Sequence, residues 1–178
     1  MHNPESASDL PASDYDYKYP MIIRYTCGDK TGEVLFKGEA TVAKSVCDEN
    51  DVVKFNSRQT SFHRVKYDPT MRKDLETFLK TNPMAMDEMD RTGLMDDAFH
   101  LAIAGEYTYP EALDTVDYIS NIDTPETSYY AWNLFSSRTS YMRGQMAGTK
   151  TGEEFLDHFR PAIEKQFNEF GFSVESNG

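Results

Sequence analysis

The residues of this 178-residue chain that could take part in metal chemistry are its four histidines, His2, His63, His100 and His158. A helix with the pattern H-E-x-x-H would place two imidazoles and a glutamate around a zinc-bound water, but no such pattern occurs. His100 follows Phe99 in a predicted helix that has no ligand partner nearby. His63 lies in a predicted strand, where packing or hydrogen bonding is its usual role. We therefore expect no metal ion and no cofactor.

Two adjacent carboxylates, Asp96 and Asp97, are the next candidates for acid–base chemistry. Neighbouring residues of an α-helix project about 100° apart, so these two carboxylates do not face each other. We expect one of them to bond a neighbouring helix or loop, because a buried carboxylate needs a partner, and the other to face water. The sequence patterns of a serine nucleophile, a dinucleotide-binding loop and a phosphate-binding loop are also absent. On motifs alone, the chain has no visible active site.

Aromatic and sulfur-containing residues give two further candidates. The cluster Tyr129-Tyr130-x-Trp132 could form a stacking platform, but its helical spacing and apolar neighbours favour a place in the core. Cys27 and Cys47 form no C-x-x-C pair. They could bridge across a sheet in an oxidising compartment. We expect two free, buried thiols instead.

The chain is acidic, with 18 Lys and Arg against 30 Asp and Glu and a net charge of −12. Such a surface repels phosphate backbones, which argues against nucleic acid as a partner. Solubility is the simple interpretation of the charge, and attraction of basic peptides or a basic protein surface is the alternative. No stretch approaches the roughly 20 apolar residues that a membrane span needs. No apolar signal segment occurs near the N-terminus, so we expect a cytoplasmic protein if Met1 is the true start.

The first third of the chain has the pattern of β-structure. Residues 1–18 are rich in Ser, Asp, Asn and Pro and are predicted to be a flexible lead-in. Residues 19–67 are predicted to form part of a β-sandwich, because short runs with a period near two alternate with polar turns. The first turn, at residues 28–32, has the glycines that a hairpin requires. The predicted strands are residues 20–27, 33–36, 41–47, 52–56 and 61–67.

Residues 68–175 have a helical period instead. Asp68 is a good N-cap and Pro69 suits the first helical position. Five helices are predicted, beginning at Pro69, near Asp87, at Pro110, at Thr124-Pro125-Glu126 and at Thr151, which could form a capping box with Glu154. Pro161 should kink or split the last helix. The predicted core face of that helix carries Phe155, Phe159, Ile163, Phe167 and Phe170. The fold class is therefore α+β, a partial β-sandwich followed by an antiparallel, HEAT-like helical array.

Several of these stretches resemble the aminopeptidase N family of zinc metallopeptidases. Lys54-Phe-Asn56 and the run SFHRVKYD that ends at Asp68 are similar to that family's K-x-N … G-Y-Y-R-V-x-Y-D. The run RTGLMDDAFHLAIAG from Arg91 resembles R-x-x-L-x-D-D-A-F-x-L-A-x-x-G, and residues 109–113 fit Y-x-x-A-L. The resemblance covers about residues 17–175. The matched motif positions, which it implies to be structural or to line the family's chamber, are Asn56, Arg64, Tyr67, Asp68, Arg91, Asp96, Asp97, Phe99 and Trp132.

The resemblance is to the C-terminal region of these enzymes, the endoplasmic-reticulum-aminopeptidase-like C-terminal domain. It implies that the chain begins within a small β-sandwich and ends after about the first five helices of a longer array that covers the active-site chamber. The family's zinc ligands, glutamate base and G-A-M-E-N motif lie in a catalytic domain that has no match here. One departure is Ser61-Phe62-His63 in place of Gly-Tyr-Tyr, which loses two hydroxyls.

The function that these observations predict is that of a non-catalytic, aminopeptidase-like module. It would bind peptides, or a protein such as a related aminopeptidase chain, on the concave side of its helices. One alternative is a fragment of an active zinc metalloaminopeptidase that needs a catalytic domain in cis, and another is a structural adaptor. A shortened array should also leave an apolar face on its last helix, which could pair with a second copy of the chain.

Overall fold

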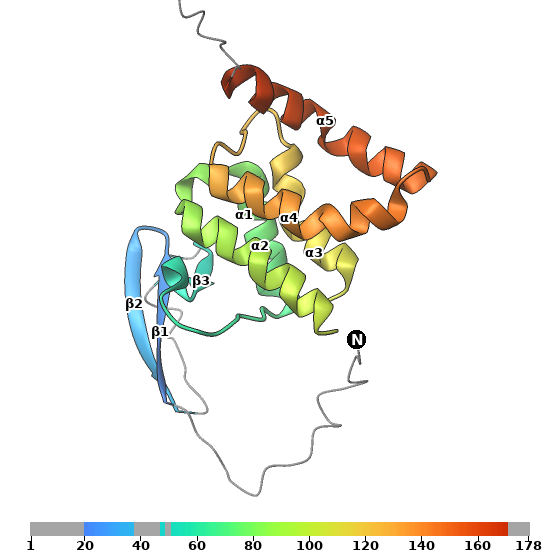
Figure 1. Cartoon of the computed structure of the whole chain (residues 1–178). Coiled ribbons are helices and arrows are strands. Elements are labelled where there is room, and N and C mark those ends of the chain that lie inside the picture. Colours follow the sequence, from blue (N-terminus) through green and yellow to red (C-terminus); the bar gives the residue numbers. More distant parts are fainter. Residues whose placement is uncertain (1–19, 38–46, 49–50, 171–178) are drawn as a thin grey trace, which may run out of the picture.

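The computed structural model describes residues 20–37, 47–48 and 51–170. In this part of the chain a three-stranded antiparallel sheet precedes five α-helices (Figure 1). The sheet stands at one side of the helices, with β1 and β2 in blue and the last helix in red. This order of elements confirms the α+β class.

The sheet has the order β2-β1-β3. Strand β1 (Met21–Cys27) pairs with β2 (Lys30–Phe36) on one side and with the short β3 (Val53–Phe55) on the other. The hairpin turn is tighter than predicted, because β2 begins at Lys30. Gly28 in this turn has a φ of 56°, in the left-handed region that glycine adopts most readily. The predicted strand at residues 41–47 lies almost entirely outside the described residues.

The state of the two cysteines differs from the expected one. Cys27 and Cys47 form a disulfide, so the prediction of two free thiols is wrong. The sheet places Cys27 at the end of β1, and the Cα atoms of the two residues lie 5.6 Å apart, within the usual span of a disulfide. The sequence could not supply this pairing, since it depends on where the chain after β2 returns to β1.

The predicted strand at residues 61–67 is also wrong. These residues pair with no strand of the described sheet and run as an extended segment along helix α2 (Glu88–Ile103). The alternating pattern arises because Val65 and Tyr67 pack on the core, whereas every second residue of the segment is exposed, namely Phe62, Arg64 and Lys66. A segment packed on a helix therefore shows the same period as a half-buried strand.

Helix α1 (Pro69–Thr81) begins as predicted. The Asp68 carboxylate accepts hydrogen bonds from the backbone N–H groups of Thr70 and Met71. Helix α2 is capped by Asp87, and Gly105 follows its end with a φ of 78°. Helix α3 (Tyr109–Val116) has a complete capping box between Thr108 and Glu111.

The N-caps of the last two helices differ from the predicted N-caps. The N-cap of α4 (Tyr129–Met146) is Ser128, several residues after the predicted cap at Thr124. At the start of α5 (Lys150–Phe170), the Thr149 hydroxyl accepts from the Gly152 N–H, so Thr151 is already helical. Helix α5 runs through Pro161 and is not split there.

Helix α2 lies at the centre of the core. It packs against α3 and α4 (Figure 1). Its Met95 and Phe99 are almost fully buried. The surrounding elements contribute Leu79, Val116, Ile119, Phe135 and Phe159. None of the helices in the described ranges is long and apolar enough to cross a membrane.

The core face of α5 differs from the predicted one. Phe155 and Phe159 pack on the core, but Ile163 and Phe167 are 44% and 58% exposed. A row of residues four apart drifts around an α-helix by about 40° per step, so it leaves the buried face. The buried face continues instead through Ala162 and Gln166. The side chain of Phe170 lies outside the described residues. The expected exposed apolar face on the last helix is thus present, and Leu156 is also on it.

The aromatic cluster at the start of α4 is divided between surface and core. Tyr129 and Tyr130 are 71% and 57% exposed, so their predicted core position is wrong. Trp132 is half-buried and packs edge-on against Phe135, 6.1 Å between ring centroids. Only Trp132 therefore has the predicted packing role.

We predict that reducing the Cys27–Cys47 disulfide lowers the free energy of unfolding by about 3 kcal/mol, since it closes a loop with a sequence separation of 20. Urea unfolding with and without reductant measures the change. The double variant Cys27→Ser/Cys47→Ser is the control and should not respond to reductant. An unchanged midpoint for the unaltered chain would contradict the prediction.

Candidate functional site

The candidate site is the stretch of residues 56–68, here called the docking segment, together with the helices that bind it. It leads from β3 to α1 and carries four of the nine motif positions. Except for one short 3-10 helix, Ser57–Gln59, it has no regular secondary structure. Its backbone groups must therefore find other hydrogen-bond partners.

Asn56 organises the start of the docking segment. It is fully buried, with a φ of 54° in the left-handed region, which asparagine tolerates better than most residues. Its Nδ2 donates to the carbonyl oxygens of Ser61 at 3.0 Å and His63 at 2.9 Å. Its Oδ1 accepts from the Ser61 N–H at 3.0 Å. One side chain thereby fixes the course of the next seven residues.

Asp96 and Asp97 bind the middle of the docking segment to α2. The Val65 N–H donates to Oδ2 of Asp97 at 3.1 Å. Nη1 of Arg64 donates to Asp97 at 3.0 Å and to Asp96 at 2.8 Å, and Arg138 of α4 donates to Asp96 at 2.6 and 2.9 Å. The prediction that one carboxylate would face water is therefore wrong, because both bind partners.

The two carboxylates differ in their pKa. Burial raises the pKa of Asp97, and the Val65 N–H and Lys54 oppose that shift only in part. Burial also acts to raise the pKa of Asp96, but the hydrogen bonds from Arg64 and Arg138 outweigh it and the pKa is lowered. Asp96 is thus a bridge between two arginines and lacks the free proton-transfer position of a general base.

Tyr67 fastens the end of the docking segment. Its hydroxyl accepts from the Phe55 N–H of β3 at 2.9 Å, and its own N–H donates to the hydroxyl of Tyr107 at 2.9 Å. The Tyr107 hydroxyl donates in turn to the Tyr67 carbonyl at 3.1 Å. Burial raises the pKa of Tyr67. The residue therefore stays a neutral structural link between the sheet and the helices.

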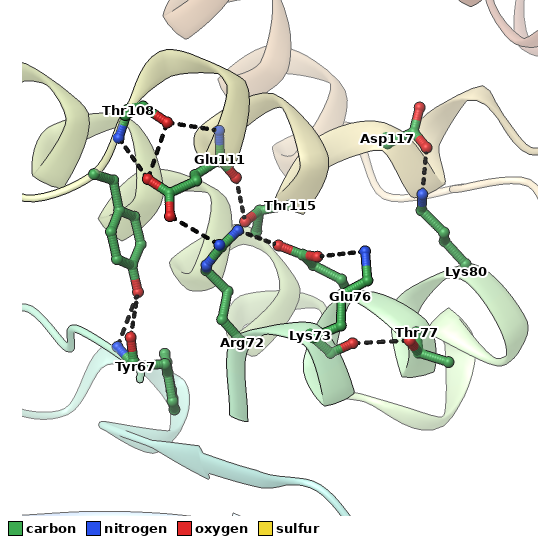
Figure 2. Close-up of polar contacts among 11 residues, drawn as sticks. Tyr67, Arg72, Lys73, Glu76, Thr77, Lys80, Thr108, Glu111, Thr115 and Asp117 are labelled. Carbon is green, nitrogen blue, oxygen red and sulfur yellow. Dashed lines mark hydrogen bonds and ion pairs between the residues drawn. The ribbon is translucent and has the colours of Figure 1, made fainter. Parts of the chain in front are cut away.

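A polar cluster between α1 and α3 lies beside this link (Figure 2). Arg72 donates to Glu76 at 2.7 Å and to Glu111 at 2.9 Å, and its guanidinium lies 5.5 Å from the centre of the Tyr107 ring. Lys73 also binds Glu76. An adjoining cavity of about 20 Å³ has room for a single water and no larger ligand. This cluster joins the two helices.

A buried ionic contact joins Arg91 of α2 to Glu126. Nε and Nη2 of Arg91 donate to the Glu126 carboxylate at 2.7 and 2.8 Å. Tyr118 and the Ser128 N–H add bonds at 2.9 and 2.8 Å, and the Trp132 indole donates to the Glu126 carbonyl at 2.8 Å. Burial acts to raise the pKa of Glu126, but Arg91 and the other donors outweigh it, and the pKa is lowered. The carboxylate is thus held ionised.

A second buried pair lies at the junction of the sheet and α2. Nζ of Lys54 is 3.8 Å from Oδ1 of Asp90 and donates to the Phe55 carbonyl at 2.5 Å. Asp90 also accepts from the Arg58 N–H. Burial lowers the pKa of Lys54, although Asp90 and Asp97 oppose the shift. A cavity of about 220 Å³ borders this pair.

Each of the nine motif residues has a hydrogen-bond or packing contact within the described part of the chain. Asn56, Arg64, Tyr67 and Asp97 hold the docking segment, Asp68 caps α1, and Phe99 is a core side chain. None of the nine lines the 220 Å³ cavity. Within the described ranges, no three His, Cys, Asp or Glu side chains lie close enough to hold a metal ion.

Several residues of the site were not predicted from the sequence. Glu126, Tyr118 and Tyr107 are not among the predicted site residues, yet they complete the buried hydrogen-bond networks. The burial of Arg91 in the structure explains the role of Glu126, because a buried guanidinium needs a carboxylate partner. Nothing local in the sequence selects Glu126 over the other acidic residues.

Comparisons with known proteins agree with the motif resemblance. The sequence model of one family, described as the ERAP1-like C-terminal domain, matches residues 52–178. Aminopeptidase A of Gloydius brevicauda is 27% identical over 149 residues, which cover 81% of this chain and 15% of that protein. Glutamyl aminopeptidase of Homo sapiens is 28% identical over 169 residues, 93% of this chain and 16% of that protein.

A third relative gives a shorter match. Aminopeptidase N of Oryctolagus cuniculus is 30% identical over 95 residues, 53% of this chain and 9% of that protein. The chain thus spans 16% or less of the length of these three curated relatives.

We predict that Tyr107→Phe lowers the free energy of unfolding by about 1–3 kcal/mol. The change leaves the buried N–H and carbonyl of Tyr67 without their shared partner. Tyr109→Phe is the matched control, because Tyr109 is exposed, and it should stay within about 0.5 kcal/mol. Equal effects of the two changes in denaturant unfolding would refute the role of Tyr107.

We predict that Glu126→Gln lowers the free energy of unfolding by about 3–5 kcal/mol, because it leaves the Arg91 guanidinium buried without a counter-charge. The folded state lowers the pKa of Glu126 below its ordinary 4.5, so its contribution is complete above that pH and is lost as the pH falls. The variant should therefore lose less stability than the unaltered chain on acidification. Glu164→Gln, at an exposed position, is the control. Unfolding curves at several acidic pH values measure both effects.

Proposed function

Because this chain belongs to the ERAP1-like C-terminal domain family, we propose that it is a non-catalytic, aminopeptidase-like module that binds a peptide or protein partner on its helices. The supporting observation is that the motif residues serve as hydrogen-bond partners within the fold. Their polar groups bond the docking segment, the sheet and the helices to one another. Such a frame presents a surface in a fixed geometry and leaves none of these groups to activate a water.

The helices carry exposed aromatic and aliphatic side chains that suit such a partner. Tyr129 and Tyr130 form an edge-to-face pair with ring centroids 5.9 Å apart. Ile163 and Leu156 are exposed on α5. Tyrosine rings are favoured at protein interfaces because they combine apolar area with a hydroxyl. The net charge of −12 favours a basic peptide or a basic protein surface over an acidic one.

The alternative is a part of an active zinc metalloaminopeptidase whose catalytic domain lies in the same protein. The observation that favours it is that the curated relatives are named as aminopeptidases and that the chain matches only a small part of each. In that case the same helices would help to shape the access of peptides to the active site.

The expected cytoplasmic location remains a proposal. The Cys27–Cys47 disulfide adds a condition to it, because disulfides of this kind persist in oxidising compartments and are reduced in the cytosol. A cytosolic form of the chain would therefore carry two thiols, one at Cys27, the last residue of β1, and one at Cys47.

We predict that the purified chain does not hydrolyse glutamyl or alanyl anilides with added zinc and that it binds a basic fluorescent peptide more tightly than an acidic one of equal length. The binding should weaken with salt, because charges at the surface are screened. Fluorescence anisotropy and an anilide assay on the same preparation provide the two readouts.

Two variants locate the binding surface. Tyr129→Ala/Tyr130→Ala should weaken peptide binding, and Tyr141→Ala, an exposed tyrosine further along α4, should not. Chelator-sensitive hydrolysis would favour the active-enzyme alternative. Equal affinity for both peptides in the unaltered chain would remove the case for a basic partner.

A further inference from the structure

His63 has an unusual position within the docking segment. Both of its ring nitrogens are buried, and neither has a hydrogen-bond partner in the part of the chain that the structure describes. The backbone of the residue is fixed, since its carbonyl accepts from Asn56 and its N–H donates to the Ser61 carbonyl. With the segment in this conformation, both ring nitrogens are therefore shielded from water.

The charged groups that act on the ring come from both elements beside the segment. Asp97 of α2 and Lys54 of β3 both act on the ring through their charges. Burial lowers the pKa of His63 and Lys54 lowers it further, whereas Asp97 raises it in part. Asp97 accepts from the Val65 N–H and from Arg64, and neither of its oxygens lies within hydrogen-bond distance of the His63 ring.

We propose that His63 makes the attachment of the docking segment to α2 sensitive to acid. Protonation gives the ring two buried N–H donors and a positive charge, with no acceptor for either donor and with the Lys54 ammonium nearby. The protonated ring is accommodated when residues 61–67 separate from α2 and the ring reaches water. The bond from the Val65 N–H to Asp97 is then the first to be lost.

The sign of the effect follows from the environment of the ring. Histidine has an ordinary pKa of 6.5, which the unfolded chain retains and the folded chain lowers. The stability that depends on the neutral ring is complete above about pH 6.5 and decreases as the pH falls below it. Between pH 7.5 and pH 5.5, the unfolding equilibrium constant should rise by up to about tenfold from this residue alone.

Replacements at the same position isolate the ring from the other titrating groups. His63→Phe keeps a flat ring of similar size and removes both nitrogens. His63→Tyr supplies the residue type found here in the aminopeptidase N pattern, and tyrosine does not titrate in this range. His158→Gln, which removes an exposed histidine on α5, is the control and should leave the docking segment's response unchanged.

The test combines urea unfolding at pH 7.5 and 5.5 with amide hydrogen exchange at Val65 and Tyr67 in the full chain. In the unaltered chain, acid should raise the unfolding constant by several-fold more than in either His63 variant, and the two amides should lose protection ahead of those in α2. An NMR titration of the His63 ring should give a midpoint below 6.5. Equal acid responses in the unaltered chain and in the variants, or a ring midpoint at or above 6.5, would overturn the proposal.

Discussion

The structure depends on side chains that hydrogen-bond to the backbone of the docking segment. An extended segment outside any sheet leaves its N–H and carbonyl groups without regular partners, and each such group is costly when buried. Asn56, Asp97 and Tyr107 supply those partners from within the segment, from α2 and from the loop before α3. Because this segment is the chain's route from the sheet to α1, these three polar side chains help to fix how the two parts lie relative to each other.

Two buried ionic pairs also hold the elements of the fold in their relative positions. Arg91 with Glu126 ties α2 to the loop before α4, and Lys54 with Asp90 ties β3 to the start of α2. Such pairs add little net stability compared with apolar contacts, because both charges lose their hydration. They do impose a penalty on every arrangement that separates the partners. In this chain they fix which surfaces of the helices and sheet meet, and that is what a module that presents a surface to a partner needs.

The helices were predictable to the extent that their signals are local. Asp68-Pro69 and the start predicted near Asp87 agree with the N-termini of α1 and α2, because capping depends only on neighbouring side chains. The docking segment was not predictable, since its alternating pattern is the same for a strand and for a segment on a helix. The Cys27–Cys47 disulfide and the choice of Glu126 by Arg91 depend on distant parts of the chain.

The motif residues show the same difference between what the local sequence predicts and what depends on the fold. Their identity came from the sequence, but their roles required the geometry. Asp96 and Asp97 look like a candidate for acid–base chemistry, and in the structure they hold Arg64, Arg138 and the Val65 N–H. The wrong prediction for Ile163 and Phe167 had a geometric cause, since a row of residues four apart leaves the buried face within two or three turns.

The full exposure of Phe62 has a further consequence. It lies in the irregular part of the docking segment, where a digestive protease with a preference for aromatic residues could reach the peptide bond that follows it. Cleavage there would cut the covalent route between the strands and the helices, but the Lys54–Asp90 pair and the bond from Phe55 to Tyr67 both cross the cut. The two pieces could therefore remain together as a complex, and a nicked chain would keep its shape until a denaturant separated them.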